Sequence, residues 1–204
     1  MSGRGKLITL EGVDGAGKST HVAFIADRLR AQGREVLLTR EPGGTPLAEK
    51  LRALVLAEPM EPVVETLLMF AARADHVQRV IRPALEAGTW VVCDRFTDAT
   101  AAYQGAGKGV SLELIQRLAD ATHPGLRPDR TVVFDCPYEI ARQRLDRSGR
   151  QLDRFESEDR SFFDRVRQAY LARAEVEPGR MRVIDASMPM ATVQERLAEY
   201  ILII

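Results

Sequence analysis

The chain has 204 residues, 45% of them hydrophobic and 28% charged, which suits one globular domain with a full core. Its 29 basic residues balance 29 acidic ones, and a formal charge of zero argues against a general nucleic-acid binder, which usually carries a basic excess. No apolar run approaches the roughly 20 residues that cross a bilayer, and the N-terminus leaves no room for a signal peptide, so we expect a cytoplasmic protein without a membrane partner.

The first predicted element is an apolar strand over residues 7–10, followed by a glycine-rich loop and a helix. Residues 12–19 read Gly-Val-Asp-Gly-Ala-Gly-Lys-Ser and match G-x-x-x-x-G-K-[ST] at every fixed position. Glycines let such a loop turn its N–H groups inward on a polyphosphate, while Lys18 can bridge phosphates and Ser19 can ligate Mg²⁺. Strand, loop and helix occur in the order that the motif requires, which favours a nucleotide site over a chance turn. The predicted nucleotide-binding residues are Gly12, Val13, Asp14, Gly15, Ala16, Gly17, Lys18, Ser19 and Thr20.

Four more short apolar runs, rich in β-branched residues, alternate with helical segments at residues 35–39, 90–93, 131–134 and 182–184. The alternation predicts an α/β fold with a five-stranded parallel sheet, its strands buried under helices on both faces. Two of the runs contain Cys93 and Cys136 or lie beside them, and we expect buried thiols rather than a disulfide. In such folds ligands bind at the carboxyl ends of the strands.

After the second strand, Arg40 could contact a phosphate and Glu41-Pro42 could fix a tight, cis turn, although a plain Pro-Gly loop explains this segment equally well. After the third strand, Asp94 has the position of the acid that holds Mg²⁺ or its waters beside a phosphate loop. The alternative for Asp94 is a helix N-cap. Arg95 follows it and would be aimed at phosphates.

A long helix between the second and third strands is predicted to begin near Pro62 and to close at Gly88. Pro83 lies in its last turn and should bend it or end it early. Phe70 and Arg73 are one turn apart, so a ring and a guanidinium could grip one planar ligand. Alternatively Phe70 is a core residue and Arg73 a surface cation, which the residues alone favour.

Thr100, Tyr103 and Gln104 lie at i, i+3 and i+4, so they share one face of a predicted helix. One aromatic ring and two hydrogen-bonding groups suit a nucleobase and its sugar. They would equally suit an ordinary solvated face.

An arginine-rich segment follows the fourth strand, with five arginines against two aspartates between residues 142 and 154. Ser148 and Gly149 interrupt its helical pattern. A mobile flap of this kind beside a phosphate loop could cover the transferring phosphates, whereas the alternative is a solvated helix with i,i+4 ion pairs. Given the phosphate loop, we favour a single domain over residues 1–204 with an arginine-rich lid at about 142–156.

Together these segments resemble bacterial thymidylate kinase, the family that phosphorylates dTMP with ATP. The resemblance covers residues 11–20, 39–52, 67–76, 94–109 and 152–163. The phosphate loop alone indicates only a nucleotide-binding superfamily, and the segments after the second and third strands make the resemblance specific. It implies the fold of P-loop nucleoside-monophosphate kinases, ATP and Mg²⁺ as cofactors, a role in dTTP biosynthesis and a homodimer.

The resemblance also implies roles at matching positions. Lys18 and the loop amides would hold ATP phosphates, with Ser19 at Mg²⁺. Asp14 matches an acid near the acceptor phosphate and the metal. Arg95 would lie between the two phosphoryl groups, and Arg40 near the dTMP phosphate.

For the dTMP nucleoside the resemblance implies that Phe70 stacks on thymine and that Arg73 hydrogen-bonds its edge. Thr100 and Gln104 would read the other edge. Tyr103 would press on the sugar where a 2′-hydroxyl would lie.

Some family members carry a catalytic arginine at the position of Gly15. This chain resembles the other subtype, which supplies the arginine from the lid, and this makes Arg147 and Arg150 the candidates. Two positions depart from many relatives: Met69 stands four residues before the arginine where they have the stacking Phe, and Ala99 stands where several have Ser.

Two other classes of protein are alternatives to this interpretation. A regulatory GTPase would need a guanine-reading Asn-Lys-x-Asp stretch, which the sequence lacks. A kinase of similar fold acting on another nucleotide or a deoxynucleoside remains an alternative on the residues alone.

Overall fold

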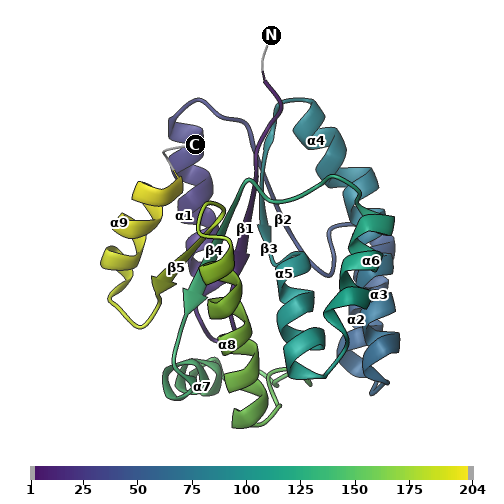
Figure 1. The fold of residues 1–204 in the computed structure, drawn as a ribbon. Coiled ribbons are helices and arrows are strands. Elements are labelled where there is room, and N and C mark those ends of the chain that lie inside the picture. Colours follow the sequence, from purple (N-terminus) through teal and green to yellow (C-terminus); the bar gives the residue numbers. More distant parts are fainter. Residues whose placement is uncertain (1–2, 202–204) are drawn as a thin grey trace.

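Five parallel strands form the centre of the computed structural model, which describes residues 3–201 (Figure 1). Their order across the sheet is β2-β3-β1-β4-β5. Every predicted strand is confirmed to within one residue at each end. The strands are β1 (Leu7–Glu11), β2 (Val36–Arg40), β3 (Trp90–Asp94), β4 (Arg130–Asp135) and β5 (Met181–Asp185).

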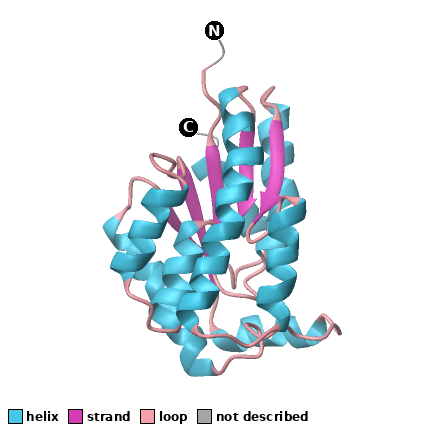
Figure 2. Ribbon diagram, turned by 90° about the vertical axis from the view of Figure 1, so that its right-hand side faces the viewer, coloured by secondary structure: helices cyan, strands magenta, loops and turns pink. Residues whose placement is uncertain are grey.

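Helices cover both faces of the sheet (Figures 1 and 2). Their bounds are α1 (Lys18–Ala31), α2 (Pro46–Ala57), α3 (Pro62–His76), η1 (Val77–Ile81), α4 (Arg82–Glu86), α5 (Thr97–Thr100), η2 (Ala101–Gly107), α6 (Leu112–Thr122), α7 (Tyr138–Arg147), α8 (Arg160–Val176) and α9 (Met190–Ile201). Successive strand residues point to opposite faces. Accordingly Ile8 of β1 packs in one core cluster with Ile25 and Leu29 of α1, while Leu7 packs in another with Leu85 of α4.

The strands are not equally buried, which corrects the prediction of five buried strands. All five residues of β1 are buried, and β1 pairs with β3 on one side and β4 on the other. The edge strands have one neighbour each, and they expose Leu38 of β2 and Val183 of β5. Continuous apolar sequence therefore predicted strand conformation correctly, but it did not separate central strands from edge strands.

The long helix begins at Pro62 as predicted, but Pro83 does not end it. The chain stays helical through α3, η1 and α4 and closes at Gly88, whose φ is 87°. Its π-helical turn, η1, directly precedes the residues around Pro83. A wider turn accommodates the missing N–H and the bulk of the proline ring, which would clash with the carbonyl one turn earlier in a regular α-helix.

Two smaller predictions, on the Glu41-Pro42 peptide bond and on the two cysteines, are confirmed. The peptide bond between Glu41 and Pro42 is cis. Cys93 and Cys136 are free, buried thiols. Within residues 3–201, no helix combines the length and the apolar character needed to cross a membrane.

Candidate active site

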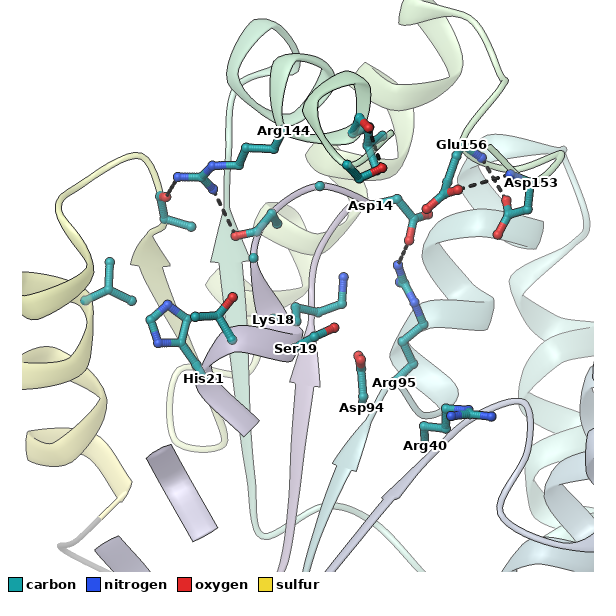
Figure 3. Close-up of a pocket in the computed structure, with 18 of the residues that line it drawn as sticks. Asp14, Lys18, Ser19, His21, Arg40, Asp94, Arg95, Arg144, Asp153 and Glu156 are labelled. Atoms are coloured by element: carbon teal, nitrogen blue, oxygen red, sulfur yellow. Dashed lines mark hydrogen bonds and ion pairs between the residues drawn. The ribbon is translucent and has the colours of Figure 1, made fainter. Parts of the chain in front are cut away.

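A cavity of about 700 Å³ opens at the carboxyl ends of the central strands, with the phosphate loop as its floor. Figure 3 shows Lys18 and Ser19 near its centre, Arg144 on one side, and Arg40 and Arg95 on the other. As labels for the two ends of this cavity, we call the side of Arg144 the donor wing and the side of Arg40 the acceptor wing; the labels do not refer to hydrogen bonds. Parallel strands bring these side chains together from distant parts of the sequence.

The glycines of the phosphate loop are required by its backbone and its packing. Gly12, Gly15 and Gly17 all have positive φ, at 130°, 80° and 90°. A Cβ at Gly12 would lie 2.5 Å from the carbonyl oxygen of Phe134, and one at Gly15 would lie 2.3 Å from that of Ala141. Only glycine permits this approach of β4 and α7 to the loop.

Lys18 is buried beneath the loop that it follows. Its ammonium group donates to the carbonyl oxygens of Gly12 at 3.0 Å and Val13 at 2.9 Å. Burial, together with the charge of Arg95, lowers the pKa of Lys18. The ammonium is therefore positioned at the cavity floor, where it can bind phosphate.

Arg95 has a left-handed backbone, with φ at 72°, which is rare for a residue with a side chain. Its guanidinium donates to the Asp14 carboxylate at 2.6 Å, to the Tyr103 hydroxyl at 3.0 Å and to the carbonyl oxygen of Gly12 at 3.0 Å. A weaker contact of 3.3 Å joins it to the Tyr170 hydroxyl. Four predicted site residues thus form one cluster. Tyr170 also belongs to it, and no pattern in the sequence indicated this because α8 lies far along the chain.

Both carboxylate oxygens of Asp14 are engaged. Arg95 donates to Oδ1, and the Tyr103 hydroxyl donates to Oδ2 at 2.7 Å. Burial raises the pKa of Asp14, but Arg95 and Lys18 more than offset this and lower it to about 2. Asp14 is therefore an ionised partner of Arg95.

Asp94 closes β3 and does not act as an N-cap, because α5 begins at Thr97 after Phe96. Its Oδ1 atom is buried and has no hydrogen-bond partner among the described residues. Ser19 lines the same cavity. A carboxylate and a hydroxyl fit a hard cation such as Mg²⁺, which is usually held by one or two carboxylates and substrate phosphates. In residues 3–201 no group of three or more His, Cys, Asp or Glu could hold a metal alone.

The acceptor wing holds two further arginines besides Arg95. Arg40 is exposed and pairs with Glu49 at 3.0 Å. Arg52, to which the sequence analysis gave no role, donates to the carbonyl oxygen of Pro42 at 3.0 Å and lines the cavity. The cations make this wing suitable for a phosphate. Helical spacing alone could not reveal that α2 turns Arg52 toward the cavity.

A smaller cavity of about 70 Å³ adjoins the acceptor wing and is lined by Met69, Tyr103 and Gln104 among others. Phe70 is instead 1% exposed and packs with Val110 and Ile115, so it is a core residue. This agrees with the alternative interpretation of Phe70 as a core residue, which the residues alone favoured. Met69, one residue earlier on α3, faces the cavity.

Arg73 is buried, so the alternative of a surface cation is wrong. Its Nε atom donates to Glu41 at 2.6 Å, and its Nη2 atom donates to the carbonyl oxygen of Phe96 and to Thr100, both at 3.1 Å. Its Nη1 atom is buried without a hydrogen-bond partner among the described residues.

The arginines of the predicted lid differ in position. Arg150 lines the main cavity and pairs with Glu156, with Nη1 at 2.7 Å from Oε2, whereas Arg147 is exposed at the end of α7 and does not line it. Arg144 donates to the carbonyl oxygens of Ala16 at 3.3 Å and Ala186 at 2.8 Å (Figure 3). Arg144 therefore joins the phosphate loop to the segment after β5, a role that the sequence analysis missed.

Comparison with known proteins agrees with this geometry. The family model described as thymidylate kinase matches residues 10–197. Thymidylate kinase of Bordetella petrii is 58% identical over 97% of this chain and 95% of its own length, and that of Pseudomonas savastanoi is 57% identical over 95% and 93%. The crystal structure of thymidylate kinase from Ehrlichia chaffeensis superposes with a TM-score of 0.78 at 33% identity, covering 96% of this chain and 98% of that one. The chain therefore belongs to the thymidylate kinase family.

Proposed function

We propose that this protein is a nucleoside-monophosphate kinase that transfers the γ-phosphoryl group of ATP to dTMP, a step of dTTP biosynthesis. An oxygen of the dTMP phosphate attacks the γ-phosphorus, the bond to ADP breaks, and dTDP forms. The attacking group is already anionic, so the reaction needs neutralised charge more than a strong base. The observation that carries the proposal is Arg95, a cation fixed between the phosphate loop and a second arginine-lined wing of the same cavity.

The donor wing suits ATP. With its phosphates on the loop amides and Lys18, the nucleoside of ATP would extend toward Arg144 and the segment after β5. Met188 and Val193 line that wing and offer apolar cover for a base. Arg144 supplies a planar cation beside it.

The acceptor wing suits dTMP. We assign the phosphate of dTMP to Arg40, Arg52 and Arg95. In the adjoining small cavity, Met69 would pack on the base in place of the aromatic ring first expected at Phe70. The unpartnered Nη1 atom of Arg73 supports a hydrogen bond to a carbonyl oxygen of thymine.

Tyr103 lines the small cavity, and its hydroxyl is engaged by Asp14 and Arg95. We therefore propose that the ring, rather than the hydroxyl, lies against the deoxyribose. Thr100 already accepts a hydrogen bond from Arg73 and would act on the base through it.

For the metal we propose Ser19 and the Oδ1 atom of Asp94 as protein contacts to Mg²⁺ or its waters. The ion would neutralise charge on the transferring phosphates. Asp14 has both oxygens engaged, so we assign it to hold Arg95 instead of the metal. Among the lid arginines, we propose Arg150 for the transferring group because it lines the cavity.

An apolar face on two packed helices supports the proposal of a homodimer. Leu47 and Leu54 on α2 and Val63, Val64 and Leu67 on α3 are each more than 40% exposed. The two helices lie together at one side of the molecule (Figure 1). We call these five residues the α2–α3 face and propose that a second copy covers it.

The proposed activity is tested by ADP formation with a panel of monophosphates. The unmutated protein should turn over dTMP in preference to dCMP, dAMP and dGMP. Lys18→Ala should lower kcat by roughly 100-fold, because it removes charge stabilisation from the transition state. The control is Lys50→Ala, at an exposed position of α2. Wild-type turnover by Lys18→Ala, or no turnover of dTMP by the unmutated protein, would contradict the proposal.

A further inference from the structure

Glu65 of α3 is a fully buried carboxylate that the proposed mechanism does not use. It accepts hydrogen bonds from Nε2 of Gln104 at 2.7 Å and from Nζ of Lys108 at 2.8 Å. Arg154, from the lid, donates to it as well. A buried carboxylate is costly unless paired, and here two cations and one amide satisfy it.

The carboxylate fixes which way the Gln104 amide points. Both oxygens of Glu65 accept hydrogen bonds, Oε1 from Gln104 and Oε2 from the two cations, so Gln104 turns its NH₂ group toward Glu65. Its carbonyl oxygen is then directed away from Glu65. Gln104 lines the small cavity beside Met69 and Tyr103, and in residues 3–201 no hydrogen bond engages that oxygen. Gln104 can therefore offer the cavity an acceptor.

We infer that Glu65 is a positioning residue that sets base specificity by holding Gln104 as a hydrogen-bond acceptor. This inference rests on the proposed function. Thymine and uracil carry an N–H group at N3, whereas cytosine carries a lone pair there. An acceptor at Gln104 pairs with the first two bases and repels the third, and unpaired polar groups in a buried site give strong discrimination.

Lys108 and Arg154 fix the direction of the hydrogen bonds to Glu65. Both side chains can only donate, so they require an acceptor at position 65. The Lys108 ammonium also lies 4.6 Å from the ring centroid of Phe155, which lines the small cavity. The two cations thus hold the carboxylate in place and connect the lid to Glu65, the residue that orients Gln104.

The test is Glu65→Gln, which preserves size and removes the charge. Lys108 and Arg154 will take the carbonyl oxygen of the new side chain, leaving its NH₂ group to face Gln104. Gln104 must then turn its own carbonyl toward that group and present NH₂ to the cavity. The ratio of kcat/KM for dTMP over dCMP should fall by at least about tenfold. The ratio of dTMP to dUMP should stay unchanged, because both bases carry N3–H.

Two further variants separate positioning from a general structural effect. Glu61→Gln makes the same change one turn earlier, at an exposed position, and should leave both ratios unchanged. Gln104→Leu should lower the dTMP to dCMP ratio, and adding Glu65→Gln to it should change the ratio no further. Arg73 is unchanged in every variant, so its own effect on the dTMP to dCMP ratio is the same in each and cannot cause a difference between them.

The outcomes distinguish this inference from the proposed function. If the unmutated protein does not prefer dTMP over dCMP, the proposed function fails. If it does, and Glu65→Gln keeps the ratio while Gln104→Leu lowers it, the inference is wrong. Should Glu65→Gln not fold, dTMP methylated at N3 is tested on the unmutated protein. It should bind at least about tenfold more weakly than dTMP, and equal binding would overturn the inference.

Discussion

At the scale of single residues, the most unusual feature is the left-handed backbone of Arg95, and Glu11 holds it in place. Glu11 is fully buried at the end of β1. Its carboxyl group accepts from the backbone N–H of Phe96 at 2.7 Å and from the Tyr170 hydroxyl at 2.8 Å. A strained backbone persists only where its surroundings fix it, and this carboxyl fixes the residue that follows Arg95.

The ionisation of Glu11 should make the stability of the protein depend on pH. Burial and the nearby charge of Asp98 raise the pKa of Glu11 from its ordinary 4.5 to about 8. Between those values the folded state holds a proton that the unfolded state has lost, so stability falls as pH rises through this window and levels off above it. Glu11→Gln lacks this dependence. Its free energy of unfolding, relative to the unmutated protein, should rise by up to about 1.4 kcal/mol per pH unit between pH 5 and 8.

Urea unfolding at pH 5.5, 6.5, 7.5 and 8.5 measures this difference. Glu86→Gln, at an exposed position of α4, is the control and should track the unmutated protein at every pH. A difference between Glu11→Gln and the unmutated protein that stays constant with pH would show that Glu11 is ionised across the range.

At the scale of elements, α7 explains why the phosphate loop carries no arginine. The Ala141 carbonyl lies so close to Gly15 that a Cβ there would approach it to 2.3 Å. Any side chain at position 15 would push α7, which contains the first part of the predicted lid, away from the loop. The packing of α7 against the loop therefore excludes an arginine at position 15.

The lid arginine can be identified by two single variants. Arg150 lines the cavity, and its pairing with Glu156 holds it in reach of the loop. Arg150→Ala should lower kcat by about 1,000-fold with little change in dTMP binding, as expected of an arginine that acts on the transferring group. Arg147→Ala is the matched variant and should lower kcat less than about threefold. A collapse of kcat in Arg147→Ala alone would reverse the assignment. If a variant that combines both substitutions turns over normally, the lid covers the site but takes no part in the chemistry.

Element type was largely predictable from sequence, but the direction of individual side chains was not. Apolar β-branched runs located all five strands, and the fixed spacing of the phosphate loop located its residues. A shift of one residue on α3 separates Met69, in the cavity, from Phe70, in the core. Helical periodicity does not determine how α3 is rotated against α6, so it could not decide between them. The π-helical turn before Pro83 was equally invisible, because no local pattern specifies it.

At the scale of the whole molecule, the strand order brings the ends of β1, β2 and β3 side by side. That geometry could be predicted, because parallel strands end at one edge of a sheet. The contacts that orient the site could not. Tyr170 meets Glu11 across 159 positions of sequence, and Arg154 meets Glu65 across 89. Such pairs depend on the packing of whole layers, which a single sequence does not reveal.

Two copies of the chain should assemble through the α2–α3 face. Light scattering should give twice the chain mass of 22.7 kDa at micromolar concentration. Leu67→Asp places a charge on an apolar side chain that is 47% exposed, so burying it between two copies would leave an unpaired carboxylate and dissociate the dimer. Val176→Asp is the matched control, because Val176 lies on α8 and is 81% exposed, and this variant should stay dimeric. A monomeric unmutated protein excludes the dimer, and a dimer that survives Leu67→Asp uses another surface.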